Sequence, residues 1–188
     1  YIHIEQSSNH ILIESEIPEN RATEIVNKHS STVKKIELYM SLFRGRDDVY
    51  AKRWENKKLK TSGYSPACAN EWVPGTCLKP KVKCSGCNHK DYQKLDENII
   101  ENHLRGNVVA GVYPMLPDET CWFLAIDFDD DGWRKDISAL AEVCSKFEIP
   151  KVIERSRSGN GAHVWFFFDQ KLQASLAGKF GSAMLTFA

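Results

Sequence analysis

Residues 121–129, which read Cys-Trp-Phe-Leu-Ala-Ile-Asp-Phe-Asp, decide the fold of this chain. A short apolar run of this kind predicts a strand over residues 121–128. Because successive side chains of a strand point to opposite faces, Asp127 and Asp129 are expected on the same side. Two carboxylates held close together repel each other unless a cation lies between them, and oxygen ligands suit Mg²⁺ or Mn²⁺. The pair indicates a phosphoryl-transfer metal site, although a run of acids at a strand exit is also typical of a solvated turn.

The residues after this strand predict an α/β domain. Apolar residues from Ile137 to Phe147 recur at helical spacing. Residues 151–156 and 162–168 read as strands, and the glycine-rich turn between them predicts a hairpin. A last helix is expected from Leu172 onward, where helical spacing returns. We expect a mixed sheet of these strands with the helices packed against it.

The predicted hairpin carries a second group of polar side chains. Gly159 and Gly161 permit a tight turn whose backbone N–H groups are free to approach a phosphate. Ser158 adds a donor at the turn, and His163 opens the next strand on the same face as Trp165. A lone histidine at the mouth of an apolar strand is more often a structural residue. Its position after a Ser-Gly turn and in the same sheet as an acidic pair favours a site residue.

The two motifs, Asp127-Phe128-Asp129 and the Ser-Gly-Asn-Gly-Ala-His of residues 158–163, resemble the first two signature motifs of the archaeo-eukaryotic primase superfamily. The wider sequence includes Leu-Phe-Arg-Gly-Arg at residues 42–46 and Gly-Tyr-Ser-Pro at residues 63–66. It resembles the primase domain that accompanies helicase and nuclease modules in bacterial TOTE conflict systems. The resemblance covers about residues 30–170.

This resemblance implies template-dependent nucleotidyl transfer by a primase or primase-polymerase, on a distorted RNA-recognition-like sheet. It implies that Asp127 and Asp129 hold two divalent metals, Mg²⁺ or Mn²⁺, and that Ser158 and His163 contact the triphosphate of the incoming nucleotide. Arg155 and Arg157 are further candidates for the same phosphates. The implied partners are a single-stranded DNA or RNA template or primer, nucleoside triphosphates, and helicase and nuclease modules.

A third acidic ligand is missing from the pattern. Members of the superfamily take it from a later strand, and no such strand is predicted between the last helix and Ala188. Asp169 lies too close behind the histidine strand to replace it. We therefore expect either a piece of a longer protein, inactive by itself, or a copy without full catalytic power.

Four of the six cysteines are crowded into residues 68–87, which favours a metal site over a disulfide framework. The Cys-x-x-Cys spacing at the end of this segment is the compact spacing of structural zinc sites, and the upstream pair is looser. Four thiolates close a tetrahedral shell, so the expected role is to fold a loop-built insert. His89 could displace one cysteine. The expected zinc ligands are Cys68, Cys77, Cys84 and Cys87.

Residues 44–60 hold seven basic side chains against three acidic ones, with Tyr50 and Trp54 interleaved. This stretch could grip template or nucleotide, or it could be the solvated face of a helix. Arg44 and Arg46 are the candidates for nucleotide, because Gly45 places them at the end of a helix predicted from residues 30–31 to Phe43. The candidates for nucleic acid are Lys52, Arg53, Lys57, Lys58, Lys81 and Lys83.

The 188 residues carry equal numbers of acidic and basic side chains, so the net charge indicates no particular partner. Neither a basic, apolar leader nor a membrane-length apolar run is visible, which predicts a soluble, cytoplasmic protein without a membrane partner. The predicted parts are a lead-in (1–29), a helix with the basic stretch (30–60), the zinc insert (61–92) and the catalytic core (93–188). Within the core, a short helix capped by Asp96 and a strand over residues 108–113 precede the acidic strand.

Two other functions stay open at this stage. A metal-dependent nuclease or phosphohydrolase would use Asp127, Asp129 and His163 as direct ligands and would need no nucleotide. A non-catalytic nucleic-acid-binding module on a degenerate primase core would bind DNA without extending it.

Overall fold

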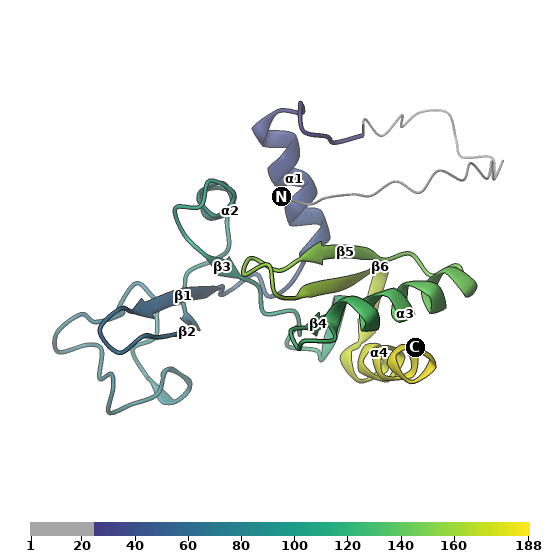
Figure 1. The fold of residues 1–188 in the computed structure, drawn as a ribbon. Coiled ribbons are helices and arrows are strands. Elements are labelled where there is room, and N and C mark those ends of the chain that lie inside the picture. Colours follow the sequence, from purple (N-terminus) through teal and green to yellow (C-terminus); the bar gives the residue numbers. More distant parts are fainter. Residues whose placement is uncertain (1–24) are drawn as a thin grey trace.

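The computed structural model describes residues 25–188, so most of the predicted lead-in (1–29) lies outside the described residues. The chain forms four α-helices, a 3-10 turn and two small sheets over these residues (Figure 1). The helices are α1 (Thr32–Leu42), α2 (Glu97–Leu104), α3 (Trp133–Lys146) and α4 (Ala174–Phe187), and η1 (Cys84–Gly86) is the 3-10 turn. The strands are β1 (Ala51–Asn56), β2 (Thr61–Pro66), β3 (Ala110–Gly111), β4 (Thr120–Phe128), β5 (Val152–Arg155) and β6 (Ala162–Gln173).

The sheet that carries the acidic strand has the order β4-β6-β5. Both of its hydrogen-bonded pairs are antiparallel, so the expectation of a mixed sheet is corrected. Since β4 and β5 both run opposite to β6, they run in the same direction, and α3 connects them along the chain. This arrangement is a split β-α-β unit, in which β6 returns through a hairpin and lies between its two neighbours. The last helix begins at Ala174 instead of Leu172, because β6 continues to Gln173.

One face of this sheet is packed against α3 and α4, which lie together on that side (Figure 1). Val164 and Phe166 of β6 are almost fully buried there against Ile137 and Leu140 of α3. At Gly181, α4 comes so close to β4 that an added Cβ would lie 2.8 Å from a methyl carbon of Leu124. The alternation of apolar residues along β4 and β6 therefore builds the core and fixes which side chains point the other way.

The opposite face of the sheet carries Asp127 on β4, His163 on β6 and Glu154 on β5. Phe43, which caps the C-terminus of α1, covers the other end of this face. Its ring meets those of Phe123, Trp165 and Phe167 edge-on, with centroids 5.0–5.8 Å apart. This aromatic cluster attaches α1 to the sheet and leaves the end with Asp127 exposed.

Replacing Phe43 by alanine is expected to lower the free energy of unfolding by about 3 kcal/mol, since a large, partly buried ring is lost together with its edge-on contacts. Thermal unfolding of wild type and variant measures the change. Replacing Phe147, which is 51% exposed, by alanine is the matched control and should change stability much less. Equal losses in the two variants would contradict the role given to the cluster.

The basic stretch does not form a helix face. Residues 51–66 form an antiparallel hairpin of β1 and β2, in which Trp54 lies over Gly63 and Arg53 stands opposite Tyr64. The predicted boundary between residues 60 and 61 therefore falls inside one hairpin. Of the strand predicted over residues 108–113, only β3 forms. It pairs with β1 in the sheet β2-β1-β3, which does not contain the acidic strand.

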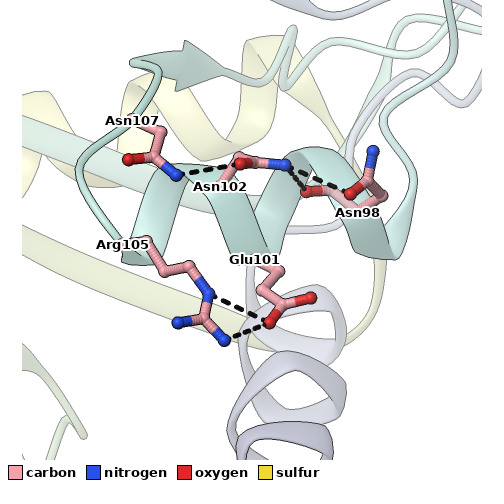
Figure 2. A network of polar contacts seen from close by, with 5 residues as sticks. All are labelled: Asn98, Glu101, Asn102, Arg105 and Asn107. Carbon is pink, nitrogen blue, oxygen red and sulfur yellow. Dashed lines mark hydrogen bonds and ion pairs between the residues drawn. The ribbon is translucent and has the colours of Figure 1, made fainter.

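Helix α2 ends in a polar network shown in Figure 2. The side-chain amide of Asn102 donates to Asn98, and the side-chain amide of Asn107 in turn donates to Asn102 Oδ1. Arg105 binds Glu101 one turn earlier with two N–H groups, at 3.0 and 2.6 Å. His103, on the same helix, has separate contacts: its Nδ1 accepts from the Ala110 N–H and its ring lies 5.8 Å from that of Tyr39.

Among residues 25–188, none of the helices has both the length and the apolar character that a membrane span needs.

Candidate functional site

The centre of the site is a row of three polar side chains that crosses the sheet from β4 through β6 to β5. His163 is the register partner of Asp127 on one side and of Glu154 on the other. Its Nε2 lies 3.4 Å from Asp127 Oδ1, and its Nδ1 lies 3.5 Å from Glu154 Oε2. The Asp127 side chain is 63% exposed, whereas those of His163 and Glu154 are about one-third exposed. The row thus has one solvated end, at the acidic pair.

Asp129 follows the last residue of β4 and is exposed, like Asp127. The hairpin turn packs directly against this strand end, because a Cβ on Gly161 would lie 2.4 Å from the Phe128 carbonyl oxygen and 3.2 Å from the Asp129 Cα. Only glycine allows this approach. The structure therefore brings the acidic motif and the histidine motif together, as the sequence predicts.

The turn itself is held by local hydrogen bonds. Gly159 has a φ of +79°, in the left-handed region that glycine adopts without strain. The Arg155 guanidinium donates to the Gly159 carbonyl at 3.0 and 3.2 Å, so Arg155 supports the turn. Ser158 Oγ accepts from the Asn160 N–H at 3.2 Å and lies 3.1 Å from Ser156 Oγ. Both Ser158 and Arg157 are exposed at the turn.

Replacing Gly161 by alanine is expected to destabilise the fold by about 1–3 kcal/mol, because the new methyl group would overlap the Phe128 carbonyl oxygen. Denaturant unfolding measures the loss. The control is Gly86→Ala, since an added Cβ there would meet nothing within 4 Å. An alanine at position 161 that is as stable as wild type would contradict the close approach.

The two arginines after α1 point to different places. The Arg44 guanidinium stacks on the Trp122 ring at 3.6 Å, beside a hollow of ≈ 430 Å³ that Phe167 and Asp169 also line. Trp122 and Asp127 are separated by about 16 Å along β4. Arg46 pairs with Asp48 at 2.8 Å. The structure therefore places Arg44 at the end of β4 away from the acidic pair, and Arg46 beside Asp48.

The lysines predicted to bind nucleic acid are exposed on the other sheet and the insert. Lys57 and Lys58 lie in the turn between β1 and β2, and Lys52 lies on β1. Arg53 is partly covered, pairing with Glu55 at 3.1 Å and donating to Ser62 Oγ. Lys81 and Lys83 are exposed on the insert.

All four cysteines of the insert line one small cavity of ≈ 20 Å³, formed by the loops of residues 67–92. A cavity of about 10–15 Å³ or more has room for one water-sized particle. His89 and Glu71 also line it. An isolated antiparallel β-bridge pairs the backbones of Cys68 and Tyr92 at the two ends of the insert, so residues far apart in these loops meet at the cavity. The other two cysteines, Cys121 and Cys144, are buried, and burial raises the pKa of both thiols.

Hydrogen-bond donors surround the cavity sulfurs. The Asp91 N–H donates to Cys68 Sγ and the His89 N–H to Cys87 Sγ, each at 3.3 Å. Hydrogen bonds from the backbone of Lys79, and then of Trp72, lower the pKa of Cys77. Lys79, whose ammonium pairs with Glu71 at 2.7 Å, also lines the cavity. Such donors favour thiolates, which are the form of cysteine that binds metal.

Neither of the two predicted metal sites is a closed ligand shell in this arrangement of side chains. Within residues 25–188, no group of three or more histidine, cysteine, aspartate or glutamate side chains is placed to hold a metal ion. For Mg²⁺ this is compatible with the acidic pair, since Mg²⁺ is commonly bound by one or two carboxylates together with waters and substrate phosphates. The cysteine sulfurs share a cavity and would need to draw together around an ion.

Comparison with known proteins gives the family. A sequence model for the archaeo-eukaryotic primase domain of TOTE conflict systems matches residues 34–188. The chain belongs to this family. The match includes both motifs and the whole cysteine insert, and it confirms the resemblance seen in the sequence. Curated proteins gave no match. The reaction class indicated for this primase domain is nucleotidyl transfer in a conflict system.

Sequence reasoning missed Glu154 in this primase domain. The residue lies within the predicted hairpin, and its place beside His163 follows from the pairing of β5 with β6. Counting back from the turn would have found it, because Arg155 pairs with Ala162 and the next pair is Glu154 with His163.

Proposed function

We propose that this primase domain carries out template-dependent nucleotidyl transfer on single-stranded DNA or RNA, as a primase or primase-polymerase. The observation that carries the proposal is the contact of the two motifs: Asp127 and His163 are register partners, and Gly161 abuts the backbone of Asp129. The split β-α-β unit supports the RNA-recognition-like catalytic half that the resemblance implies.

In this proposal the exposed end of the row binds the reacting groups. Asp127 and Asp129 would hold Mg²⁺ or Mn²⁺, and these ions would supply charge stabilisation for the triphosphate and the attacking 3′-hydroxyl. The His163 Nε2, 3.4 Å from Asp127, faces the place where the triphosphate would lie. Ser158, Arg157 and the backbone N–H groups of the glycine turn would orient the phosphates.

The insert and the β1–β2 hairpin would bind the nucleic-acid strand. Most of their lysines are exposed and can contact phosphates, among them Lys52, Lys57, Lys58, Lys81 and Lys83. Trp54 and Tyr64 are about half exposed and offer rings on which bases can stack. Zinc held by the four cysteines would order the insert. Helicase and nuclease modules are the partners that the TOTE setting suggests, and the pathway would be conflict with phages or other mobile elements.

The test is incorporation of labelled nucleotides on single-stranded DNA and RNA by the full-length protein, with Mg²⁺ or Mn²⁺ and with EDTA. Metal-dependent incorporation that requires a template supports the proposal. Metal-dependent strand cleavage without added nucleotide would support a nuclease or phosphohydrolase instead. Binding of DNA without incorporation or cleavage would support a non-catalytic binding module.

A further inference from the structure

The imidazole of His163 has one nitrogen that the described hydrogen bonds leave without a partner. Its Nδ1 is buried and makes no hydrogen bond among the residues described, 25–188. A buried polar nitrogen without a partner is costly, so its neighbours matter. The nearest acidic atom is Glu154 Oε2, at 3.5 Å, which is about 0.5 Å longer than a usual hydrogen bond.

Glu154 is held in place by a second contact. The indole Nε1 of Trp165 donates to the same oxygen, Glu154 Oε2, at 3.1 Å. Trp165 lies two residues after His163 on β6, and the two rings are 5.7 Å apart, nearly edge to face. Trp165 is itself fixed by Phe43, whose ring meets it edge-on at 5.0 Å. The Glu154 carboxylate is therefore held by a tryptophan that is itself packed, and it lies beside the buried Nδ1 of the imidazole.

Two titratable side chains lie near Glu154, Tyr39 on α1 and His103 on α2. Burial and then the negative charge of Glu154 raise the pKa of Tyr39 to about 12. Burial lowers the pKa of His103, while the same carboxylate acts in the opposite direction. Glu154 is thus close enough to both helices to affect the pKa of a side chain on each.

We propose that Glu154 is a positioning residue for His163: it accepts a hydrogen bond from Nδ1–H, so that Nε2 is presented to Asp127 and to the substrate. The role of His163 toward the substrate rests on the proposed function, in which that substrate is a nucleoside triphosphate. A neutral histidine carries its proton on one nitrogen only, and each nitrogen of His163 has a carboxylate beside it. Nε2 lies beside Asp127, which is 63% exposed, so water can also bond there, whereas the buried Nδ1 has only Glu154 beside it; the proton of the neutral ring is therefore expected on Nδ1. Hydrogen bonds of this kind are often long before substrate binds and shorten in the complex. In the doubly protonated ring, Nε2–H would also be free to donate to a phosphate oxygen.

The first test reads the tautomer of His163 directly. Two-bond ¹⁵N–¹H spectra of ¹⁵N-histidine-labelled chain, at about pH 8.5 where histidine side chains are ordinarily neutral, distinguish Nδ1–H from Nε2–H. We expect Nδ1–H in wild type and in Glu154→Gln, whose carbonyl oxygen can still accept. Loss of this preference is expected in Glu154→Ala. Glu142→Ala, on the exposed side of α3, is the control and should match wild type.

The second test measures nucleotide incorporation by the full-length protein. We expect Glu154→Ala to lower kcat/KM by about 10–100-fold, the usual effect of losing a partner that orients a site histidine, and Glu154→Gln to lose much less. Backbone amide spectra that retain wild-type dispersion show that each variant is folded.

The outcomes separate the two proposals. Equal tautomer populations in wild type and Glu154→Ala would overturn the positioning role whatever the activity. A changed tautomer with an unchanged rate would overturn its role in the reaction. Absence of incorporation by wild type would defeat the proposed function, while the tautomer spectra would still decide the place of Glu154.

Discussion

Replacing Asp127 and Asp129 together by alanine should abolish nucleotide incorporation, with a fall in rate of at least about 1000-fold. Both carboxylates are exposed at the end of β4, so their loss should leave the fold intact. Phosphoryl transfer depends on positioning and on neutralising the charge of the phosphates, and an alanine pair provides neither ligand. Incorporation of labelled nucleotide by the full-length protein, with Mg²⁺ or Mn²⁺, measures the effect.

The matched control is Asp131→Ala, which removes an exposed acid two residues further along the same run. Incorporation should continue in this variant at close to the wild-type rate. Asp130 is unsuitable as a control, because its Oδ1 accepts from the Gly132 N–H at the start of α3. If the double alanine variant retained incorporation, or if Asp131→Ala lost it equally, the acidic pair would not be the metal site.

Replacing Cys84 and Cys87 together by serine should release one zinc ion per chain and unfold the insert. In residues 67–92, Ala67 is fully buried and the other side chains are partly or fully exposed. Little besides the metal would therefore hold these loops together. Structural zinc sites supply about 10–16 kcal/mol of apparent binding free energy in small peptides, which is large against the stability of a domain. Zinc content by atomic absorption and limited proteolysis within residues 67–92 measure the two effects.

The control for this prediction is Cys121→Ala, which removes a thiol buried in the other sheet. It should retain the full zinc content. The β4-β6-β5 sheet should stay folded in the serine variant, because its core is formed by α3 and α4. A wild-type chain purified without zinc, or a serine variant that keeps it, would show that the four sulfurs do not form a zinc site.

The elements around the site could be predicted because their apolar periodicity is strong. In β4 and β6, one face is continuous with the core, so the alternation itself predicted that Asp127 and His163 lie on the opposite face. The β1–β2 hairpin was harder, since charged residues fill β1 and its aromatic residues pack on glycine and arginine instead of on a core. Periodicity cannot distinguish a helix from a strand when neither face is apolar.

Two side-chain placements depend on contacts between elements, which the sequence does not state. The row formed by Asp127, His163 and Glu154 exists only in the observed registers of β4 and β5 with β6. The place of Arg44 depends on the tertiary packing of α1, which sends its guanidinium to Trp122 at the far end of β4. Such side-chain partners are set by the docking of whole elements, and local propensity carries no information about them.

The close approach of Gly161 to β4 also limits how this hairpin can evolve. One residue inserted into or deleted from the turn would shift β6 against β5 and reverse the faces on which Glu154 and His163 lie. The length of the segment from Arg155 to Ala162 is therefore expected to be invariant among active homologues. The loops of residues 67–92 are tied together only at the cavity and at the bridge between Cys68 and Tyr92, so they can gain or lose residues between cysteines.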